Sequence, residues 1–400
     1  MMAKTLAKKI LALTGDETAA EAMRQINPDV VAAYPITPQT EIVQNYSQFV
    51  ANGMVKTEMV RVESEHSAMS ACIGAAAAGA RAMTATCANG LALMWEVLYI
   101  AASYRLPIVM AVVNRALSGP INIHCDHSYS MGARDSGWIQ LYSENCQEVY
   151  DNLIQAVKIG ENKNVLLPVM VCFDGFIISH ETERVEILED EEVKNFIGEF
   201  KIEHSLLDLK HPVTYGPLDL FDYYFEHKRQ QVDAMEKAIP VIKEVGKEYG
   251  RLSGRSYELV EKFNMENADM VIVALGSTAG TIKATIEELK ENGIENVGLL
   301  KIRAFRPFPY EDIQNNLKDK ACVAVMDRSA SFGALGGPVF LEVRSALYEL
   351  NKRPLVINYI YGLGGRETSV EHIKKVVEGL NKIRKSKKVE NLVNYLGVRE

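Results

Sequence analysis

The chain has 400 residues, a length that predicts two or three domains, and its 48% hydrophobic and 24% charged residues are typical of a globular protein. A formal net charge of −8 and the lack of a long basic run argue against a nucleic-acid-binding surface. The sequence contains no apolar stretch of about 18 residues or more, so we predict no membrane span. The first residues lack the long apolar core of a signal peptide.

The six cysteines are spread singly along the chain, and none forms a CxxC pair: Cys72, Cys87, Cys125, Cys146, Cys172 and Cys322. This spacing predicts reduced thiols and a cytoplasmic location. It also predicts that this chain itself holds no iron–sulfur cluster and no structural zinc.

The first half alternates short apolar runs with helical patterns. Strands are predicted near residues 30–36, 81–87, 106–114 and 166–175. Apolar strands with helices between them are typical of βαβ units around a parallel sheet. Residues 176–217 show no clear period and predict an irregular surface segment. A long polar helix is predicted from about 219 to 263, with breaks near Pro240 and Gly250.

The alternation of strand and helix restarts at Ala268 and continues to a closing helical pattern that ends in a lysine-rich tail. We therefore predict a second, smaller α/β domain of about 130 residues. The predicted division places residues 1–255 in the first domain and residues 256–400 in the second.

The stretch "YPITPQTE", residues 34–41, ends the first predicted strand of the parallel sheet. Pro35 and Pro38 cannot donate to a sheet ladder and rigidify the exit from the strand. Thr37 or Thr40 is predicted to cap the helix that follows. Ligands of open α/β sheets bind at the carboxyl ends of strands, but taken alone this stretch favours a plain strand-to-helix turn.

Two further strand ends carry candidate residues. Glu63 and Glu65 open a helix that contains seven consecutive small residues, 74–80. Acids in a first helical turn are commonly there to complement the helix dipole. Asn89 and Gly90 form a strand-to-helix turn in which glycine permits close backbone approach, unless the turn is an ordinary βα loop.

The richest polar stretch follows the third buried strand and is predicted to be a functional loop without an element of its own. It begins with Arg115, which is placed to clamp a carboxylate, and continues through His124, Asp126 and His127. The run His-Cys-Asp-His suggests a metal, but adjacent residues converge poorly on one ion, and we predict none. The glycine-rich turns of the second half lack the GxGxxG fingerprint, which disfavours a dehydrogenase.

Together these motifs resemble the alpha subunits of pyruvate:ferredoxin oxidoreductase (pyruvate synthase), within the 2-oxoacid:ferredoxin oxidoreductase family. The matching segments lie in order in both halves: "YPITPQTE", "ESEHSAMSACIGAAAAGARAMTAT", "GLALMWEVLYIAASYRLPIVMAVVNR", "DHSYSMGARDSGWIQLYSEN", "KIRAFRPFP" and "YGLGGRET". The resemblance implies an α/β chain with a thiamine diphosphate pyrimidine-binding domain, 1–255, and a transketolase C-terminal-like domain, 256–400.

The implied reaction is the reversible oxidation of pyruvate with CoA to acetyl-CoA and CO₂, with reduction of ferredoxin. The family pattern makes this chain one subunit of a heterotetramer with beta, gamma and delta subunits. Thiamine diphosphate is shared with the beta subunit, and Mg²⁺ and the [4Fe-4S] clusters belong to the partners. The chain alone is expected to be inactive.

The resemblance also assigns roles to residues. Glu65 is implied to bind the pyrimidine ring, Thr37 to hydrogen-bond the substrate, and Arg115 to lie near its carboxylate. The remaining implied positions surround the cofactor or form the substrate loop: Pro35, Ile36, Asn89, Gly90, His124, Asp126 and His127.

Cys125, Tyr129 and Asn89 depart from the family pattern, which leaves the substrate open. Branched-chain 2-oxo acids, 2-oxoglutarate and oxalate are the alternatives within the family. A non-catalytic assembly subunit is the alternative of another class.

Overall fold

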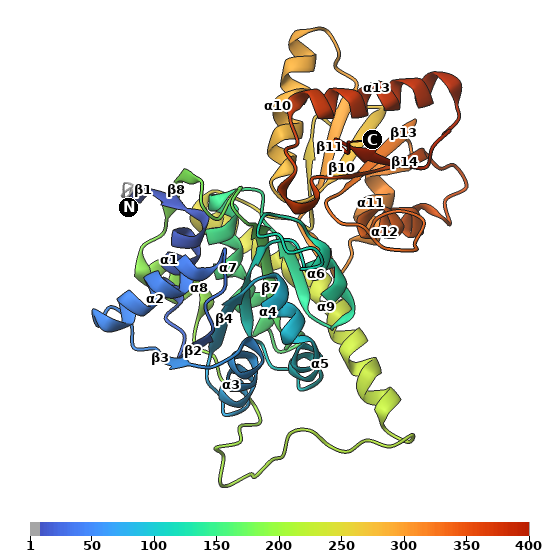
Figure 1. Ribbon diagram of the computed structural model, residues 1–400. Coiled ribbons are helices and arrows are strands. Elements are labelled where there is room, and N and C mark those ends of the chain that lie inside the picture. Colours follow the sequence, from blue (N-terminus) through green and yellow to red (C-terminus); the bar gives the residue numbers. More distant parts are fainter. Residues whose placement is uncertain (1–8, 400) are drawn as a thin grey trace, which may run out of the picture.

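The computed structural model describes residues 9–399, which form two large sheets covered by helices (Figure 1). The first sheet has seven strands, in the spatial order β12 (Ala304–Arg306), β6 (Ile139–Tyr142), β7 (Val169–Asp174), β5 (Val109–Asn114), β4 (Ala82–Thr86), β2 (Val30–Ala33) and β3 (Glu58–Arg61). All neighbours are parallel except β12 and β6. The central strands β5 and β7 are buried along their whole length, as expected for a sheet with helices on both faces.

The helices of the first half follow the strands in alternation: α1 (Gly15–Ile26), α2 (Thr40–Ala51), α3 (Glu65–Ala77), α4 (Ala88–Leu93), α5 (Trp95–Ser103) and α7 (Cys146–Gly160). Helix α1 packs between α2 and α7. The four strands predicted in this half are all present, as β2, β4, β5 and β7. The parallel α/β arrangement predicted for this half is confirmed.

Two predictions about irregular segments were wrong. The polar loop after β5 contains α6 (Ser128–Gly132), the turn η1 (Ala133–Asp135) and strand β6, because the short apolar run at β6 is fully buried. Residues 176–217 contain β8 (Thr182–Ile187) and α8 (Asp190–Ile197). Strand β8 pairs with β1 (Lys9–Thr14) in a separate two-stranded sheet.

The expected breaks in the long polar helix are also absent. Helix α9 runs without interruption from Tyr224 to Ser253 and includes Pro240. An internal proline costs a helix about 3 kcal/mol, so packing must offset the loss. The turns around Pro240 bury Ala238 and Ile242 completely. Before α9 the chain makes a long excursion away from the body of the molecule (Figure 1).

The second sheet has six strands, in the order β15 (Val393–Leu396), β14 (Leu355–Tyr361), β13 (Cys322–Asp327), β10 (Met270–Ala274), β11 (Val297–Ile302) and β9 (Val260–Phe263). Only β9 is antiparallel to its neighbour. Its helices are α10 (Thr278–Glu291), α11 (Tyr310–Leu317), α12 (Pro338–Leu347) and α13 (Val370–Ser386), with the turn η2 (Leu363–Gly365). The alternation predicted from the sequence is therefore present here too.

The two halves are joined by more than the connecting chain. Strand β12 follows β11 and returns to pair with β6 at the edge of the first sheet. One continuous apolar core extends from the first sheet into the second half. The division at residues 255 and 256 stays a prediction. Within residues 9–399 no helix is both long and apolar enough to cross a bilayer.

Candidate active site

Four candidate segments lie at one edge of the first sheet. Thr37 follows β2, Glu65 follows β3, Gly90 follows β4, and Arg115 follows β5. These strands are consecutive neighbours in the sheet and run in parallel, so their carboxyl ends open onto the same side. The tertiary structure thus brings together residues that are up to 78 positions apart.

Arg115 and Thr37 are in direct contact. The Nη1 atom of the buried Arg115 donates to the carbonyl oxygen of Thr37 at 2.6 Å. The same carbonyl accepts from the Sγ atom of Cys87 at 3.0 Å. Burial raises the pKa of Cys87 to about 12, so its thiol stays protonated and can donate. Sequence reasoning missed Cys87 as part of this site; its position directly after β4 was the available signal.

The side chain of Thr37 is exposed at the tip of its loop, and it caps no helix. The capping role predicted for Thr37 or Thr40 was wrong, because α2 begins after Gln39 without a side-chain cap. Gln39 instead stabilises the loop through its side-chain amide. Its Nε2 atom donates to the carbonyl oxygens of Tyr34 at 2.8 Å and Ala85 at 3.2 Å.

Glu65 is the first residue of α3, whose N-cap is Ser64. The Glu65 side chain is only 6% exposed, and its carboxylate has no hydrogen bond within the described residues. Gly90 lies against it: a Cβ atom on Gly90 would be 2.8 Å from Glu65 Oε1 and 2.4 Å from Thr86 Oγ1. The Thr86 hydroxyl is itself buried without a partner. Within residues 9–399, the Glu65 carboxylate and the Thr86 hydroxyl therefore have no hydrogen-bond partner, and both lie against the backbone of Gly90.

The remaining residues predicted around the cofactor lie in the same loops. Asn89 is exposed on α4, and its Nδ2 atom donates to Ser118 Oγ at 2.9 Å, which links this turn to the loop after β5. Pro35 is exposed and Ile36 is half-buried in the loop that carries Thr37.

The three residues predicted for the substrate loop have different surroundings. His124 is exposed, and its ring centroid lies 5.1 Å from that of Phe176. Asp126 is buried and accepts from the backbone N–H groups of Ser128 at 3.0 Å and Gly364 at 3.3 Å. His127 is also buried. Asp126 and His127 therefore connect the loop to the second half, and their role toward substrate stays a prediction.

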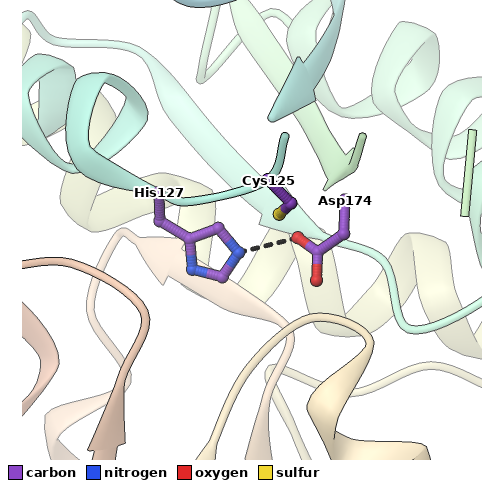
Figure 2. A group of neighbouring side chains, drawn as sticks. All are labelled: Cys125, His127 and Asp174. Atoms are coloured by element: carbon purple, nitrogen blue, oxygen red, sulfur yellow. Dashed lines mark hydrogen bonds and ion pairs between the residues drawn. The ribbon is translucent and has the colours of Figure 1, made fainter. Parts of the chain in front are cut away.

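Figure 2 shows His127 beside Cys125 and Asp174, which ends β7; one potential ligand atom from each lies within 4.8 Å of the others. His127 Nε2 lies 2.7 Å from Asp174 Oδ1. The cation at this position is the guanidinium of Arg328, which donates to Asp174 Oδ2 at 2.9 Å and to Cys125 Sγ at 3.5 Å. Burial and Asp174 raise the pKa of Cys125, and Arg328 lowers it.

Burial by itself would raise the pKa of Asp174, but His127 and Arg328 hold it well below its usual range. The carboxylate is therefore charged and is paired across the two halves of the chain. Ser277, at the start of α10, adds a further hydrogen bond from its hydroxyl at 2.6 Å. Asp174, His127 and Arg328 therefore form a buried ionic cluster that joins the two halves of the chain, called the ionic joint below.

Comparison with known proteins identifies the family. Residues 21–247 match the model described as pyruvate flavodoxin/ferredoxin oxidoreductase, thiamine diphosphate-binding. Residues 268–373 match the model described as pyruvate:ferredoxin oxidoreductase core domain II. The chain belongs to the pyruvate:ferredoxin oxidoreductase family.

Relatives of this family resemble the chain over nearly its full length. It is 60% identical to pyruvate synthase subunit PorA of Thermotoga maritima, over 98% of both chains. It is 44% identical to ketoisovalerate oxidoreductase subunit VorA of Pyrococcus abyssi, over 97% of both chains. A solved 2-oxoglutarate:ferredoxin oxidoreductase from Magnetococcus marinus shares the fold, with a TM-score of 0.73 at 20% identity, over 93% of this chain and 65% of that one.

These findings confirm the resemblance and the fold class predicted from the sequence. The site residues remain predictions, but they fit one end of thiamine diphosphate. A pyrimidine ring offers a nitrogen that can share a proton with a carboxylate, and Glu65 is a buried carboxylate without a partner. Gly90 allows the backbone of α4 to approach this carboxylate closely.

Proposed function

We propose that this chain is the alpha subunit of a pyruvate:ferredoxin oxidoreductase. With its partner subunits it catalyses the reversible, CoA-dependent oxidative decarboxylation of pyruvate to acetyl-CoA and CO₂, with reduction of ferredoxin. The observation that carries the proposal is a buried Glu65 carboxylate without a partner, in a chain 60% identical to a protein named pyruvate synthase subunit PorA.

In this proposal Glu65 binds the aminopyrimidine end of thiamine diphosphate and shares a proton with a ring nitrogen. When bound, thiamine diphosphate would supply a nucleophilic carbon and an electron sink for decarboxylation. Gly90 lets the backbone of α4 lie directly against Glu65, since any Cβ atom there would overlap with the carboxylate. Pro35, Ile36 and Asn89 surround this end of the coenzyme from the adjacent loops.

Thr37 and Arg115 act on the substrate. The exposed hydroxyl of Thr37 hydrogen-bonds the 2-oxo acid, and the positive charge of Arg115 attracts its carboxylate. Arg115 uses Nη1 to hold the Thr37 carbonyl, while its buried Nε atom has no hydrogen-bond partner among residues 9–399. One guanidinium can thus position the loop and bind the substrate. His124 borders the substrate, and Asp126 and His127 shape its loop.

The partners are proposed to be beta, gamma and delta subunits, with the beta subunit binding the diphosphate and Mg²⁺. The [4Fe-4S] clusters and the contact with ferredoxin belong to the partners. The word "subunit" in the names of the relatives supports an assembly. All six cysteines of this chain are free thiols and are buried, which supports a cluster-free chain in a reducing, cytoplasmic setting.

The 44% identity to a ketoisovalerate oxidoreductase subunit makes a branched-chain 2-oxo acid the second candidate substrate. The native complex should be purified and assayed for viologen reduction with pyruvate, 2-oxoisovalerate and 2-oxoglutarate, each with CoA. The highest kcat/KM is expected with pyruvate. A preference for either of the others would reassign the substrate, and no turnover with any of them would favour an assembly subunit.

The role of Glu65 is tested by Glu65→Gln in the reconstituted complex. We expect a loss of about 10²–10⁴-fold in kcat, the range for a positioned proton-transfer group. Glu63→Gln is the matched control, because Glu63 is in the same turn of chain but is exposed and bonds only its neighbour Ser67. Normal turnover by Glu65→Gln would refute the assignment.

A further inference from the structure

A second cluster of potential ligands lies where α1 and α2 begin. Asp16 is the second residue of α1, Glu41 is in the first turn of α2, and His180 is in the loop after β7. One carboxylate oxygen from each acid and one ring nitrogen of His180 lie within 4.8 Å of one another. None of these residues is used in the proposed coenzyme or substrate site.

Asp16 is fully buried, and neither of its carboxylate oxygens has a hydrogen-bond partner in the part of the chain that the structure describes. The start of α1 cannot supply one, because its N–H groups are already used. Gly15 and Asp16 donate to the carbonyl oxygens of Ile178 and Ser179, each at 3.0 Å, and Glu17 donates to Thr14 Oγ1 at 3.2 Å. A buried carboxylate with both oxygens free is costly and calls for a ligand.

The charges nearest to Asp16 increase this cost. Burial raises the pKa of Asp16, and the negative charges of Glu41 and Glu17 raise it further. No salt bridge from a lysine or arginine reaches Asp16 within residues 9–399. The local field therefore favours either a bound proton or a cation.

His180 is held in an orientation that suits a ligand. Its Nδ1 atom lies 2.7 Å from Ser179 Oγ, which also accepts from the N–H of Phe176 at 2.8 Å. The Phe176 ring lies 4.7 Å from the imidazole and limits its rotation. The Nε2 atom faces Glu41 Oε1 at 4.0 Å. A histidine ligand is typically fixed in this way by a hydrogen bond to its other nitrogen.

We propose that Asp16, Glu41 and His180 form a binding site for a divalent metal ion. Two carboxylates and one imidazole suit ions such as Mn²⁺ and Zn²⁺, which accept both kinds of donor. An ion with bonds of about 2.1 Å holds opposite donors about 4.2 Å apart, so donors within 4.8 Å of one another need only a small rearrangement. Asp16 is enclosed, while Glu41 and His180 are half-exposed and leave a path for the ion to enter.

The test uses the full-length chain, stripped of metal with a chelator and titrated with Mn²⁺ alone. Loss of the free Mn²⁺ signal in electron paramagnetic resonance counts the bound ions. We expect one ion per wild-type chain and at least about tenfold weaker binding in Asp16→Asn, since Asn has no charge. Glu21→Gln is the matched control: Glu21 is also on α1 but pairs with Arg24, and its variant should bind like the wild type.

Two further measurements keep the proposal falsifiable. His180→Gln alters a half-exposed ligand and is expected to weaken binding without unfolding the chain, which circular dichroism checks. At the same Mn²⁺ concentration, the Tm should rise more for the wild type than for Asp16→Asn. Equal Mn²⁺ binding in all variants would overturn the proposal, and so would an unchanged wild-type Tm, which would indicate a protonated Asp16. Loss of the ion in the assembled complex would also overturn it.

Discussion

The guanidinium of Arg115 and the carbonyl oxygen of Thr37 are 2.6 Å apart, and this bond connects the loop after β5 to the loop after β2. Arg115 is therefore a structural support of the loop whose hydroxyl is proposed to bind substrate. Cys87 donates to the same carbonyl from the end of β4, the strand between them.

Arg115→Lys is expected to lower kcat/KM for pyruvate by about 10- to 100-fold in the complex. Lysine offers a single point charge, so it cannot bond Thr37 and a carboxylate with the forked geometry of arginine, and hydrogen bonds to charged groups contribute about 1.5–3 kcal/mol. Steady-state kinetics measure the effect. Arg134→Lys is the control, because Arg134 also donates to a backbone carbonyl, that of Met131. Equal kcat/KM values for Arg115→Lys and Arg134→Lys would contradict the prediction.

Gly90→Ala is expected to displace Glu65 and to abolish most of the activity while the fold remains. The new methyl group would lie within 2.8 Å of Glu65 and closer still to Thr86. Activity and coenzyme affinity in the complex, with Tm, measure the effect. Gly74→Ala is the control: it adds the same group in α3, where nothing lies within 4 Å, and should slightly stabilise the helix. An active Gly90→Ala enzyme would show that Glu65 has room to move.

Arg328→Met is expected to destabilise the chain by about 3–5 kcal/mol, because it leaves the charge of Asp174 buried without its arginine. Chemical unfolding of the full chain measures the change. Lys237→Met removes an exposed lysine that pairs with Asp233, and a change of about 0–1 kcal/mol is expected. Similar losses of unfolding free energy in Arg328→Met and Lys237→Met would show that the ionic joint does not stabilise the chain more than an exposed ion pair does.

The stability of the chain is expected to fall with acid partly through Asp174. Its pKa is held below the unfolded-state value of about 4, so its ionic contribution is present above that pH. The contribution is lost progressively as the pH falls below about 4 toward the lower folded-state pKa. Urea midpoints measured from pH 7 to pH 3 should fall less steeply for Asp174→Asn than for the wild type. A parallel decline would exclude Asp174 as a cause.

The thiols of the folded chain are expected to be unreactive at pH 8. All six cysteines are buried, and burial raises the pKa of Cys87 to about 12 and of Cys322 to about 11. A chromogenic disulfide reagent should therefore detect no rapid reaction before denaturation and six thiols afterwards. Rapid labelling of Cys87 in the native chain would show that its loop opens.

Local sequence patterns determined many of the strands and helices of this protein. Buried apolar runs such as β5 and β7 carry their own signal, because a strand covered on both faces must be apolar throughout. The family followed from ordered motifs, and the roles predicted for Glu65 and Arg115 followed from the resemblance together with their positions after strands. The short strand β6 was missed, because it has only four residues next to a polar loop and its burial depends on neighbours elsewhere in the chain.

Only the tertiary structure decided which of these residues meet. Parallel sheet order sets β5, β4, β2 and β3 side by side and so places the Arg115 guanidinium against the Thr37 loop. It also brings His127 and Arg328 to the same carboxylate, that of Asp174, rather than leaving His127 in an open loop. Sequence patterns report which face of an element is apolar, but contacts between distant residues arise from how the elements pack, and no local period encodes that.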